Sequence, residues 1–245
     1  MVQVKDCEVV DTLKKSGFKI IQDRKRFCFG IDAVILADYA EIRNNDVVYD
    51  LGTGTGIIPM LLAGRSSTVK ITALEVQQES ADMAERSVAM NGLESVINVV
   101  HGDIKNTSEL FPKAQADVVT CNPPYMIFQH GKQNPSDCKA IARHEVLCTL
   151  EDVVKSASYL LKPKGRFYMI HRPFRLAEIF RVMAAYNLEP KRMRLVQPFV
   201  DKEPNMVLLE ARKGANSRIT VEKPLVVYKT PGDYTDEIKS IYEIC

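Results

Sequence analysis

Four consecutive residues, Asn122-Pro123-Pro124-Tyr125, carry the most specific chemical signal in this chain. Two adjacent prolines neither continue a strand nor open a regular helix, so they hold the backbone rigid and leave its carbonyl groups free. The side-chain oxygen of Asn122 and the carbonyl of Pro123 can then accept both hydrogens of one exocyclic NH2 group, and Tyr125 offers a flat face. A purely structural turn is the alternative, but the apolar strand expected at 117–121 immediately before it favours a site for a planar amine.

A glycine-rich turn after the apolar run Val47–Leu51 carries the second signal. Gly52, Gly54 and Gly56 alternate along it, which allows positive φ and lets a ligand approach the backbone. A strand, such a turn and a helix form half of a nucleotide-binding crevice. The third glycine comes one residue too early for the dinucleotide pattern G-x-G-x-x-G, and Asp50 would repel a pyrophosphate but attract an ammonium group. A nicotinamide cofactor is therefore disfavoured.

Acidic side chains stand at the ends of three successive predicted strands. Asp50 ends the first, Glu75 ends a strand over 69–75, and Asp103 follows a strand over 96–100. The carboxyl ends of parallel strands meet at one edge of a sheet, where a carboxylate such as Glu75 can accept bonds from both ribose hydroxyls of a nucleoside. Any one of the three acids could be a helix cap. Together they predict a nucleoside site.

The elements that must position these residues alternate between strands and helices. Apolar β-branched runs predict seven strands, at 47–51, 69–75, 96–100, 117–121, 166–170, 192–196 and 205–212. Helical spacing of apolar residues predicts helices at 33–40, 57–63, 77–91, 149–161, 174–186 and 236–242. This alternation predicts an α/β fold, with a Rossmann-like, mostly parallel sheet whose last strand is antiparallel and with helices on both faces. A turn at 163–165 is expected to open the fifth strand.

Two local signals concern helix starts. A capping box from Thr149 to Asp152 predicts the start of the helix that follows. Asp32 is expected to be the N-cap of the helix that ends near Ala40. The segment 29–32, Phe-Gly-Ile-Asp, has a second, functional interpretation, in which it closes over the bound ligand.

Composition limits the class of protein. With 245 residues and 46% hydrophobic content, the chain can bury the core of a single domain, 1–245, in which residues 1–45 form an N-terminal cap segment. It has no apolar run of about 18 residues, its N-terminus is charged, and its six cysteines include no C-x-x-C pair. Its four histidines show no metal-ligand spacing. We therefore expect a cytoplasmic protein with no membrane segment and no metal.

Charge is distributed unevenly along the sequence. Residues 151–220 hold 14 basic and 7 acidic side chains, whereas residues 51–150 hold 8 and 10. A basic third, together with Arg24-Lys25-Arg26, suits a polyanionic substrate bound beside the cofactor half, although a solvated basic face is the simpler alternative. The irregular stretch 126–148 is interpreted as a substrate lid, with Arg143 and His144 near its mouth.

These motifs together resemble those of known enzymes. The run Asp50-Leu-Gly-x-Gly-x-Gly resembles motif I of the class I S-adenosylmethionine (SAM) methyltransferases, which have a seven-stranded sheet. With the segment from Phe29, Asn-Pro-Pro-Tyr at 122–125, Ala-Arg-His-Glu at 142–145 and Pro-Leu-Val-Val-Tyr at 224–228, residues 15–245 resemble the bacterial tRNA(Val) N6-adenine methyltransferase family.

The resemblance implies a cofactor, a substrate and a set of site residues. The cofactor would be SAM, and the substrate would be the anticodon-loop adenine of a valine tRNA. Independently of the resemblance, we expect a monomer. The catalytic residues would be Asn122, Pro123, Pro124 and Tyr125. The cofactor-binding residues would be Phe29, Gly30, Asp32, Asp50, Gly52, Gly54, Gly56, Glu75, Asp103 and Asn122.

Two other functions remain open on the sequence alone. N5-glutamine protein methyltransferases share Asn-Pro-Pro-Tyr, because a glutamine side chain also presents a planar NH2 group. Members of that family carry an N-terminal helical domain that the 46 residues before the first strand cannot supply. A non-catalytic SAM- or RNA-binding protein is the third possibility, but it would have no need of a loop that grips an amine.

Overall fold

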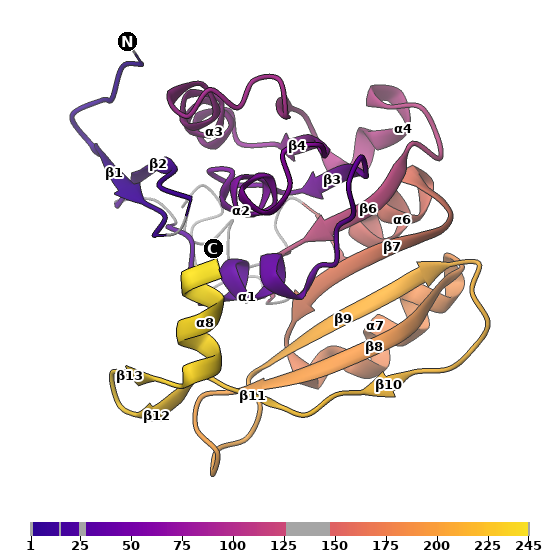
Figure 1. Cartoon of the computed structure of the whole chain (residues 1–245). Helices are drawn as coiled ribbons and strands as arrows, with labels where there is room; N and C mark the ends of the chain where they lie inside the picture. The colour runs from indigo at the N-terminus through magenta and orange to yellow at the C-terminus, as the bar shows by residue number, and fades with distance from the viewer. Residues whose placement is uncertain (1, 15, 25–27, 126–147, 245) are drawn as a thin grey trace, which may run out of the picture.

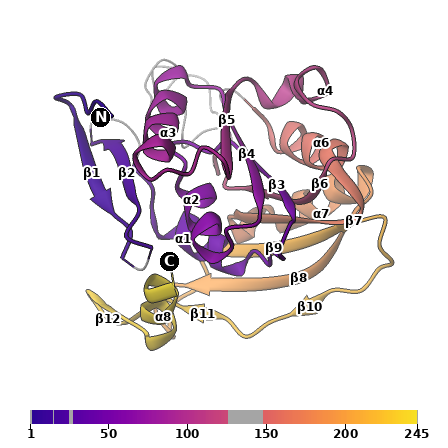
Figure 2. The ribbon, with the colours of Figure 1, turned by 45° about the horizontal axis from the view of Figure 1, so that its top comes forward.

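A nine-stranded sheet forms the centre of the computed structural model, which describes residues 2–14, 16–24, 28–125 and 148–244. Its strands lie in the order β10-β8-β9-β7-β6-β3-β4-β5, and β11 also pairs with β8 (Figure 1; β5 is labelled in Figure 2). Neighbours from β5 to β7 are parallel, whereas β9 runs antiparallel to β7 and β8. The strands are β3 (Val47–Leu51), β4 (Lys70–Glu75), β5 (Ile97–His101), β6 (Ala116–Cys121), β7 (Leu161–His171), β8 (Leu188–Gln197), β9 (Met206–Lys213), β10 (Thr220–Val221) and β11 (Leu225–Val226).

This architecture confirms the predicted α/β class and corrects two details. The sheet exceeds the predicted seven strands because the two-residue strands β10 and β11 pair with the outer strand β8. The predicted turn at 163–165 lies inside β7, which begins at Leu161. There the register with β6 shifts and Lys164 has φ of 65°, so a bulge carries the strand through Pro163.

Strand alternation divides the core into two layers, one on each face of the sheet. Val118 belongs to one layer and Val119 to the other, as do Tyr168 and Phe167, because successive side chains of a strand point to opposite faces. The first layer is covered by α1 (Ile31–Tyr39), α2 (Ile57–Arg65), α3 (Gln78–Met90) and α8 (Asp236–Ile244). The second is covered by α6 (Leu150–Leu160) and α7 (Leu176–Ala185), with the short α4 (Thr107–Leu110) and the 3-10 turns η1 (Ile104–Asn106) and η2 (Pro173–Arg175) nearby.

The two predicted helix starts have different outcomes. Thr149 and Asp152 form the predicted capping box at the start of α6. The prediction that Asp32 is an N-cap is wrong, because α1 begins at Ile31 and its N-cap is Gly30. Asp32 lies in the first turn of α1, and its carboxylate accepts a bond from the backbone N–H of Ala33 at 3.0 Å. Its second carboxylate oxygen is thereby left for a partner outside the helix.

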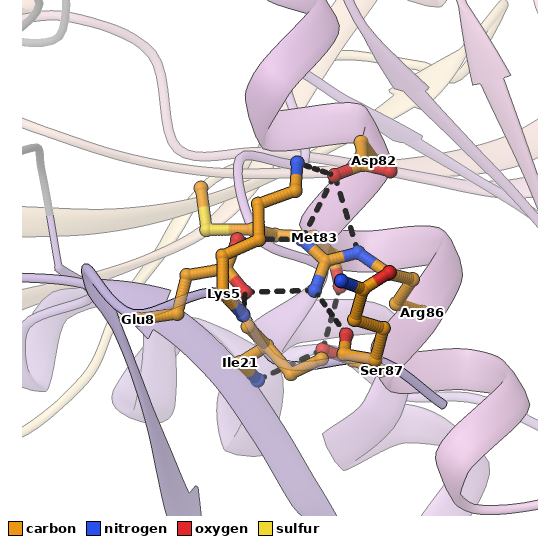
Figure 3. Close-up of polar contacts among 8 residues, drawn as sticks. Lys5, Glu8, Ile21, Asp82, Met83, Arg86 and Ser87 are labelled. Carbon is orange, nitrogen blue, oxygen red and sulfur yellow. Dashed lines mark hydrogen bonds and ion pairs between the residues drawn. The ribbon is translucent and has the colours of Figure 1, made fainter. Parts of the chain in front are cut away.

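An N-terminal hairpin of β1 (Glu8–Thr12) and β2 (Lys19–Asp23) packs beside α3 (Figure 2). Figure 3 shows its attachment, in which Arg86 of α3 binds both carboxylate oxygens of Glu8 at 2.6 and 2.8 Å and also contacts Asp82 at 2.8 Å. The backbone N–H of Ile21 donates to the hydroxyl of Ser87 at 2.9 Å. Side chains of α3 thus fix the hairpin that leads into residues 28–33.

The C-terminal segment covers α1. The short hairpin of β12 (Tyr228–Thr230) and β13 (Asp233–Tyr234) precedes α8, which packs against α1 near the end of the chain (Figure 1). Ile238 and Ile241 of α8 are buried in the same core layer as the apolar residues of α1. Since Asp32 lies on α1, both ends of the chain support the segment that carries it.

Candidate active site

A cavity of about 410 Å³ opens at the carboxyl ends of the parallel strands. This volume lies within the range of about 300–1,000 Å³ that is typical of small-molecule sites. Its wall combines residues after β3, β4, β5, β6 and β7 with the segment that leads into α1. Eleven of the thirteen predicted site residues line it: Phe29, Gly30, Asp32, Gly52, Gly54, Glu75, Asp103, Asn122, Pro123, Pro124 and Tyr125. The structure therefore brings together residues that are spread over almost one hundred positions.

The glycine turn presents bare backbone to the cavity. Gly52 and Gly54 have φ of 72° and 59°, which an L side chain rarely adopts. The N–H groups of Gly52 and Thr53 donate to the carbonyl of Leu74 at 2.9 and 3.0 Å, which ties the turn to β4. A Cβ atom at Gly54 would meet no heavy atom within 4 Å. The turn can therefore receive a ligand directly against its main chain.

Glu75 joins the turn to the start of α3. Its carboxylate accepts bonds from the backbone N–H groups of Gly54 and Gln77, each at 2.8 Å. Burial raises the pKa of Glu75, and these backbone donors partly offset the effect. A carboxylate has about four acceptor positions, so each oxygen can still accept a further hydrogen bond. Glu75 is thus placed to accept from hydroxyl groups of a ligand in the cavity.

Asp50 and Gly56 do not line the cavity, among the residues that the structure describes. Asp50 is 1% exposed and accepts a bond from the hydroxyl of Thr120 at 2.6 Å. Burial raises its pKa to about 6, against the lowering effect of that bond. Gly56 precedes α2 with φ of 88°, and a Cβ there would lie 3.2 Å from Cβ of Ala84. Both residues therefore support the turn from behind.

Asp103 has two roles at once. It lines the cavity, and its side chain accepts a bond from the N–H of Lys105 at 2.9 Å as the N-cap of η1. Asp103 is therefore a helix cap, which was the alternative interpretation of each strand-end acid. It nevertheless belongs to the cavity wall. The capped turn holds its carboxylate at the cavity wall.

Tyr125 has close side-chain neighbours from two other segments of the chain. Its hydroxyl lies 2.7 Å from Oδ2 of Asp32 and 2.5 Å from Oδ1 of Asn122. The guanidinium carbon of Arg172 lies 4.8 Å from the centre of the tyrosine ring, and the ring of His171 meets it edge-on at 5.5 Å. Burial and the Asp32 carboxylate raise the pKa of Tyr125 well above its usual range, so the phenol stays protonated.

Sequence reasoning missed several residues of the wall, among them Cys28, Thr53, Gln77, Ser80, Cys148 and Arg172. Arg172 follows the end of β7, which pairs with β6 directly before Asn122. The strand-end rule that found Glu75 and Asp103, applied to the fifth predicted strand, would have found it. His171 supports the same corner: it is fully buried, and burial lowers its pKa to about 4, so its ring is neutral.

Some predicted features lie in residues that the structure does not describe, and the expected absence of a metal and of a membrane segment can be examined only in the residues that it does describe. The predicted lid over 126–148, with Arg143 and His144, lies outside them except for Cys148, as do Lys25, Arg26 and Ala142–Glu145. Within the described ranges, no group of three or more His, Cys, Asp or Glu side chains could hold a metal ion. None of the helices described is long and apolar enough to cross a membrane.

Comparisons with known proteins point to one class of enzyme. Residues 31–185 match the family model of the methyltransferase small domain. The tRNA1(Val) (adenine(37)-N6)-methyltransferase of Tolumonas auensis is 30% identical over 222 residues, which cover 90% of each chain. The protein of the same name from Porphyromonas gingivalis is 30% identical over 198 residues, 79% of this chain and 77% of the relative. A structure from Agrobacterium tumefaciens, titled a predicted O-methyltransferase, shares the fold with a TM-score of 0.70 at 23% identity, over 87% of this chain and 96% of that one.

The fold and the site therefore define a class I SAM-dependent methyltransferase. Within this class, the chain belongs to the bacterial tRNA1(Val) (adenine(37)-N6)-methyltransferase family. S-adenosyl-L-methionine is its cofactor, and the residues present fit this molecule. Gly54 leaves the backbone open, Glu75 retains acceptor capacity for hydroxyls, and the buried Oδ2 of Asp50 has no hydrogen-bond partner among the described residues. An unpaired buried carboxylate oxygen behind the turn favours a cationic ligand in front of it.

Proposed function

We propose that this enzyme transfers a methyl group from SAM to N6 of an adenine in tRNA. The observation that carries the proposal is the position of Asn122 and Pro123, which line the same cavity as the glycine turn and Glu75. An amine held by this loop would lie beside the cofactor rather than at a separate site. The names of the relatives support adenine 37 of tRNA1(Val) as the particular target.

The chain's own contribution to the reaction is orientation. Bound SAM supplies a methyl group on a positively charged sulfur, from which an attacking amine can displace it. Asn122 Oδ1 and the Pro123 carbonyl would accept the two N6 hydrogens and direct the nitrogen lone pair, otherwise delocalised into the adenine ring, at the methyl group. The nitrogen held by Asn122 and Pro123 would bond to the methyl carbon as the carbon–sulfur bond breaks, and one N6 proton would then leave to water. No strong general base is required.

Tyr125 would hold the adenine ring on one face only. Arg172 covers the other face of the tyrosine at 4.8 Å from the ring centre. Removing a base from its stack costs a few kcal/mol, and stacking on an aromatic side chain contributes about 1–3 kcal/mol per base. Tyr125 can therefore offset much of the unstacking penalty, and the cation behind it makes the ring a fixed platform.

The basic third of the sequence attracts RNA less than its composition indicates. Several of its cations are paired with acids from outside residues 151–220, as in Arg166–Asp46, Lys162–Asp117, Arg194–Glu237 and Arg192–Glu222. Arg175 pairs with Glu178 inside the segment. Neutralised side chains release few counterions when a phosphate backbone binds. We therefore expect a shallower salt dependence of tRNA affinity than a net charge of +7 would give.

The experiment is methyl transfer from labelled SAM to separate pools of bacterial tRNA, DNA and protein, followed by nucleoside and amino-acid analysis. We expect N6-methyladenosine in the tRNA pool alone. A tRNA1(Val) transcript should also be methylated, and the same transcript with guanine in place of adenine 37 is the matched control. Label in protein glutamine would overturn the proposal in favour of an N5-glutamine methyltransferase. SAM binding without transfer to any pool would indicate a binding protein.

A further inference from the structure

Three side chains form a continuous hydrogen-bonded chain between α1 and the loop after β6. The hydroxyl of Tyr125 stands in the middle, 2.7 Å from Oδ2 of Asp32 and 2.5 Å from Oδ1 of the Asn122 amide. All three residues line the cavity. A hydroxyl group carries one hydrogen, so Tyr125 can donate to only one of these two neighbours.

The chemistry of the two neighbours decides the direction of the bonds. An ionised carboxylate only accepts, and a hydrogen bond to a charged acceptor is about twice as strong as one between neutral groups. Tyr125 keeps its proton because burial raises its pKa, so it donates to Asp32. The tyrosine oxygen is then an acceptor toward Asn122, and two acceptor oxygens at 2.5 Å would repel each other. The structure places Oδ1 of Asn122 at this position, but this bonding pattern requires the N–H2 group there, because the two ends of an amide are assigned from their hydrogen bonds.

We propose that Asp32 is a positioning residue that acts through the Tyr125 hydroxyl to fix which end of the Asn122 amide faces the substrate. The two ends of an amide have nearly the same shape and differ in their hydrogen bonds. With Nδ2 held by Tyr125, Oδ1 turns away from the tyrosine and is free to accept from a substrate amine. The opposite orientation would set an N–H2 group against the substrate N–H2 and exclude productive binding. The inference rests on the proposed function, because only an amine substrate requires this orientation.

The residue before α1 supplies an independent observation. A Cβ atom at Gly30 would lie 2.7 Å from Oδ1 of Asp32, which is closer than any real Cβ contact. Gly30 has φ of −108°, so alanine can adopt its backbone conformation without strain. A side chain at position 30 would therefore displace the Asp32 carboxylate rather than strain the local backbone.

The test measures single-turnover methyl transfer at saturating SAM and tRNA, beside the Kd of each ligand. Tyr125→Phe keeps the stacking ring and removes the central hydroxyl. Asp32→Asn replaces the obligate acceptor with a group that can also donate. Each is expected to lower the rate by about 10–100-fold while both Kd values stay within about threefold, since small misplacements of reacting groups act on rate. Tyr186→Phe is the matched control, because its hydroxyl also donates to a carboxylate, that of Glu151 at 2.7 Å.

Coupling separates this role from a structural one. If the three residues act as one chain, the double variant Tyr125→Phe/Asp32→Asn is expected to be no slower than the slower single variant, because the second change has nothing left to remove. Gly30→Ala, which displaces the same carboxylate, should lower the rate at saturating SAM with normal thermal stability.

Three results would overturn the inference. They are wild-type rates in Tyr125→Phe or in Asp32→Asn, losses that multiply in the double variant, and defects that appear only as weaker SAM binding. A wild-type enzyme that methylates no tRNA adenine would instead refute the proposed function, and the positioning role would fail with it. The two failures are therefore distinguishable in one set of assays.

Discussion

The cavity has two walls that are built in different ways. The first, which we propose binds the cofactor and call the cofactor wall, is Gly52–Gly54 with Glu75. It is held by backbone groups: the turn donates to the Leu74 carbonyl, and Glu75 accepts from two main-chain N–H groups. The second, which we propose orients the substrate and call the catalytic wall, is Asn122–Tyr125 with Asp32 and Arg172. It is held by side chains that come from the start of α1, the loop after β6 and the residue after β7.

This difference assigns the two walls different tasks. Backbone groups belong to every residue, so the shape of the glycine turn depends on its φ angles rather than on side-chain partners, and the Glu75 carboxylate adds acceptors for the ligand. Side-chain contacts depend on the identity of each partner, so one substitution in the catalytic wall alters orientation at the reacting atoms. We therefore expect changes in the cofactor wall to act on SAM affinity or on folding, and changes in the catalytic wall to act on the rate of methyl transfer.

The largest effect is expected from Asn122→Ala. It removes the side-chain acceptor for the substrate amine, and loss of one orienting group at a reacting centre lowers rates by about 10²–10³-fold. SAM affinity should change by less than about threefold, because Glu75 and the glycine turn stay in place. Single-turnover transfer beside equilibrium SAM binding checks both values. Loss of SAM binding equal to the loss of rate would contradict the division between the walls.

The next effect compares two glycines of the same turn. Gly54→Ala and Gly56→Ala both place alanine at a positive φ, which costs about 1–2 kcal/mol. The Cβ at Gly56 also meets Ala84 at 3.2 Å, whereas at Gly54 it enters the open cavity. We expect Gly56→Ala to lower stability more in urea melts, and Gly54→Ala to weaken SAM binding more in calorimetry. Equal losses of stability and of SAM affinity in the two variants would contradict this distinction and show that the turn acts as a single unit.

The smallest effect concerns the buried carboxylate behind the turn. Burial raises the pKa of Asp50 to about 6, above about 3.9 in an unfolded chain. Between these values the folded protein holds a proton that the unfolded chain has lost, so stability falls as pH rises from about 4 to 6 and the loss is complete above that window. An asparagine at this position cannot ionise, so Asp50→Asn avoids this loss of folding stability, which is on the order of 1–3 kcal/mol.

Thermal melts without cofactor check this prediction. The melting temperature of Asp50→Asn minus that of the wild type is expected to increase between pH 4.5 and 6.5 and then stay constant. The asparagine oxygen can still accept from Thr120, whose hydroxyl lies 2.6 Å from Oδ1 of Asp50, so the variant keeps that contact. A difference that does not change with pH would mean that Asp50 titrates at its ordinary pKa.

The two walls also differ in how far the sequence predicts them. The cofactor wall follows from short motifs, because the strand, the glycine turn and the acid at the next strand end are local features. Sheet topology then brings Gly54 and Glu75 together without further information. Even here the sequence does not show which residues of the motif line the cavity: Asp50 and Gly56 belong to the motif but lie behind the wall.

The catalytic wall could be predicted only in part. The local pattern identifies Asn122 and Tyr125, because two prolines after an apolar strand are rare. Asp32 was expected as a helix cap or a cofactor contact, and its bond to Tyr125 spans 93 positions of the chain. No spacing rule predicts which way a side chain turns across such a distance. The packing of α1 against the sheet decides that contact.

The central claim is that the two walls separate affinity from rate, and one measurement tests it most directly. Methyl transfer to tRNA is followed in single turnovers as a function of SAM concentration for Glu75→Ala and Asn122→Ala. We expect Glu75→Ala to need about 10–100-fold more SAM, because hydrogen bonds to a charged group are lost, and then to reach the wild-type rate. Asn122→Ala should saturate at the wild-type SAM concentration and stay slow. A rate for Glu75→Ala that stays low at saturating SAM, or an Asn122→Ala defect that SAM restores, would contradict the account.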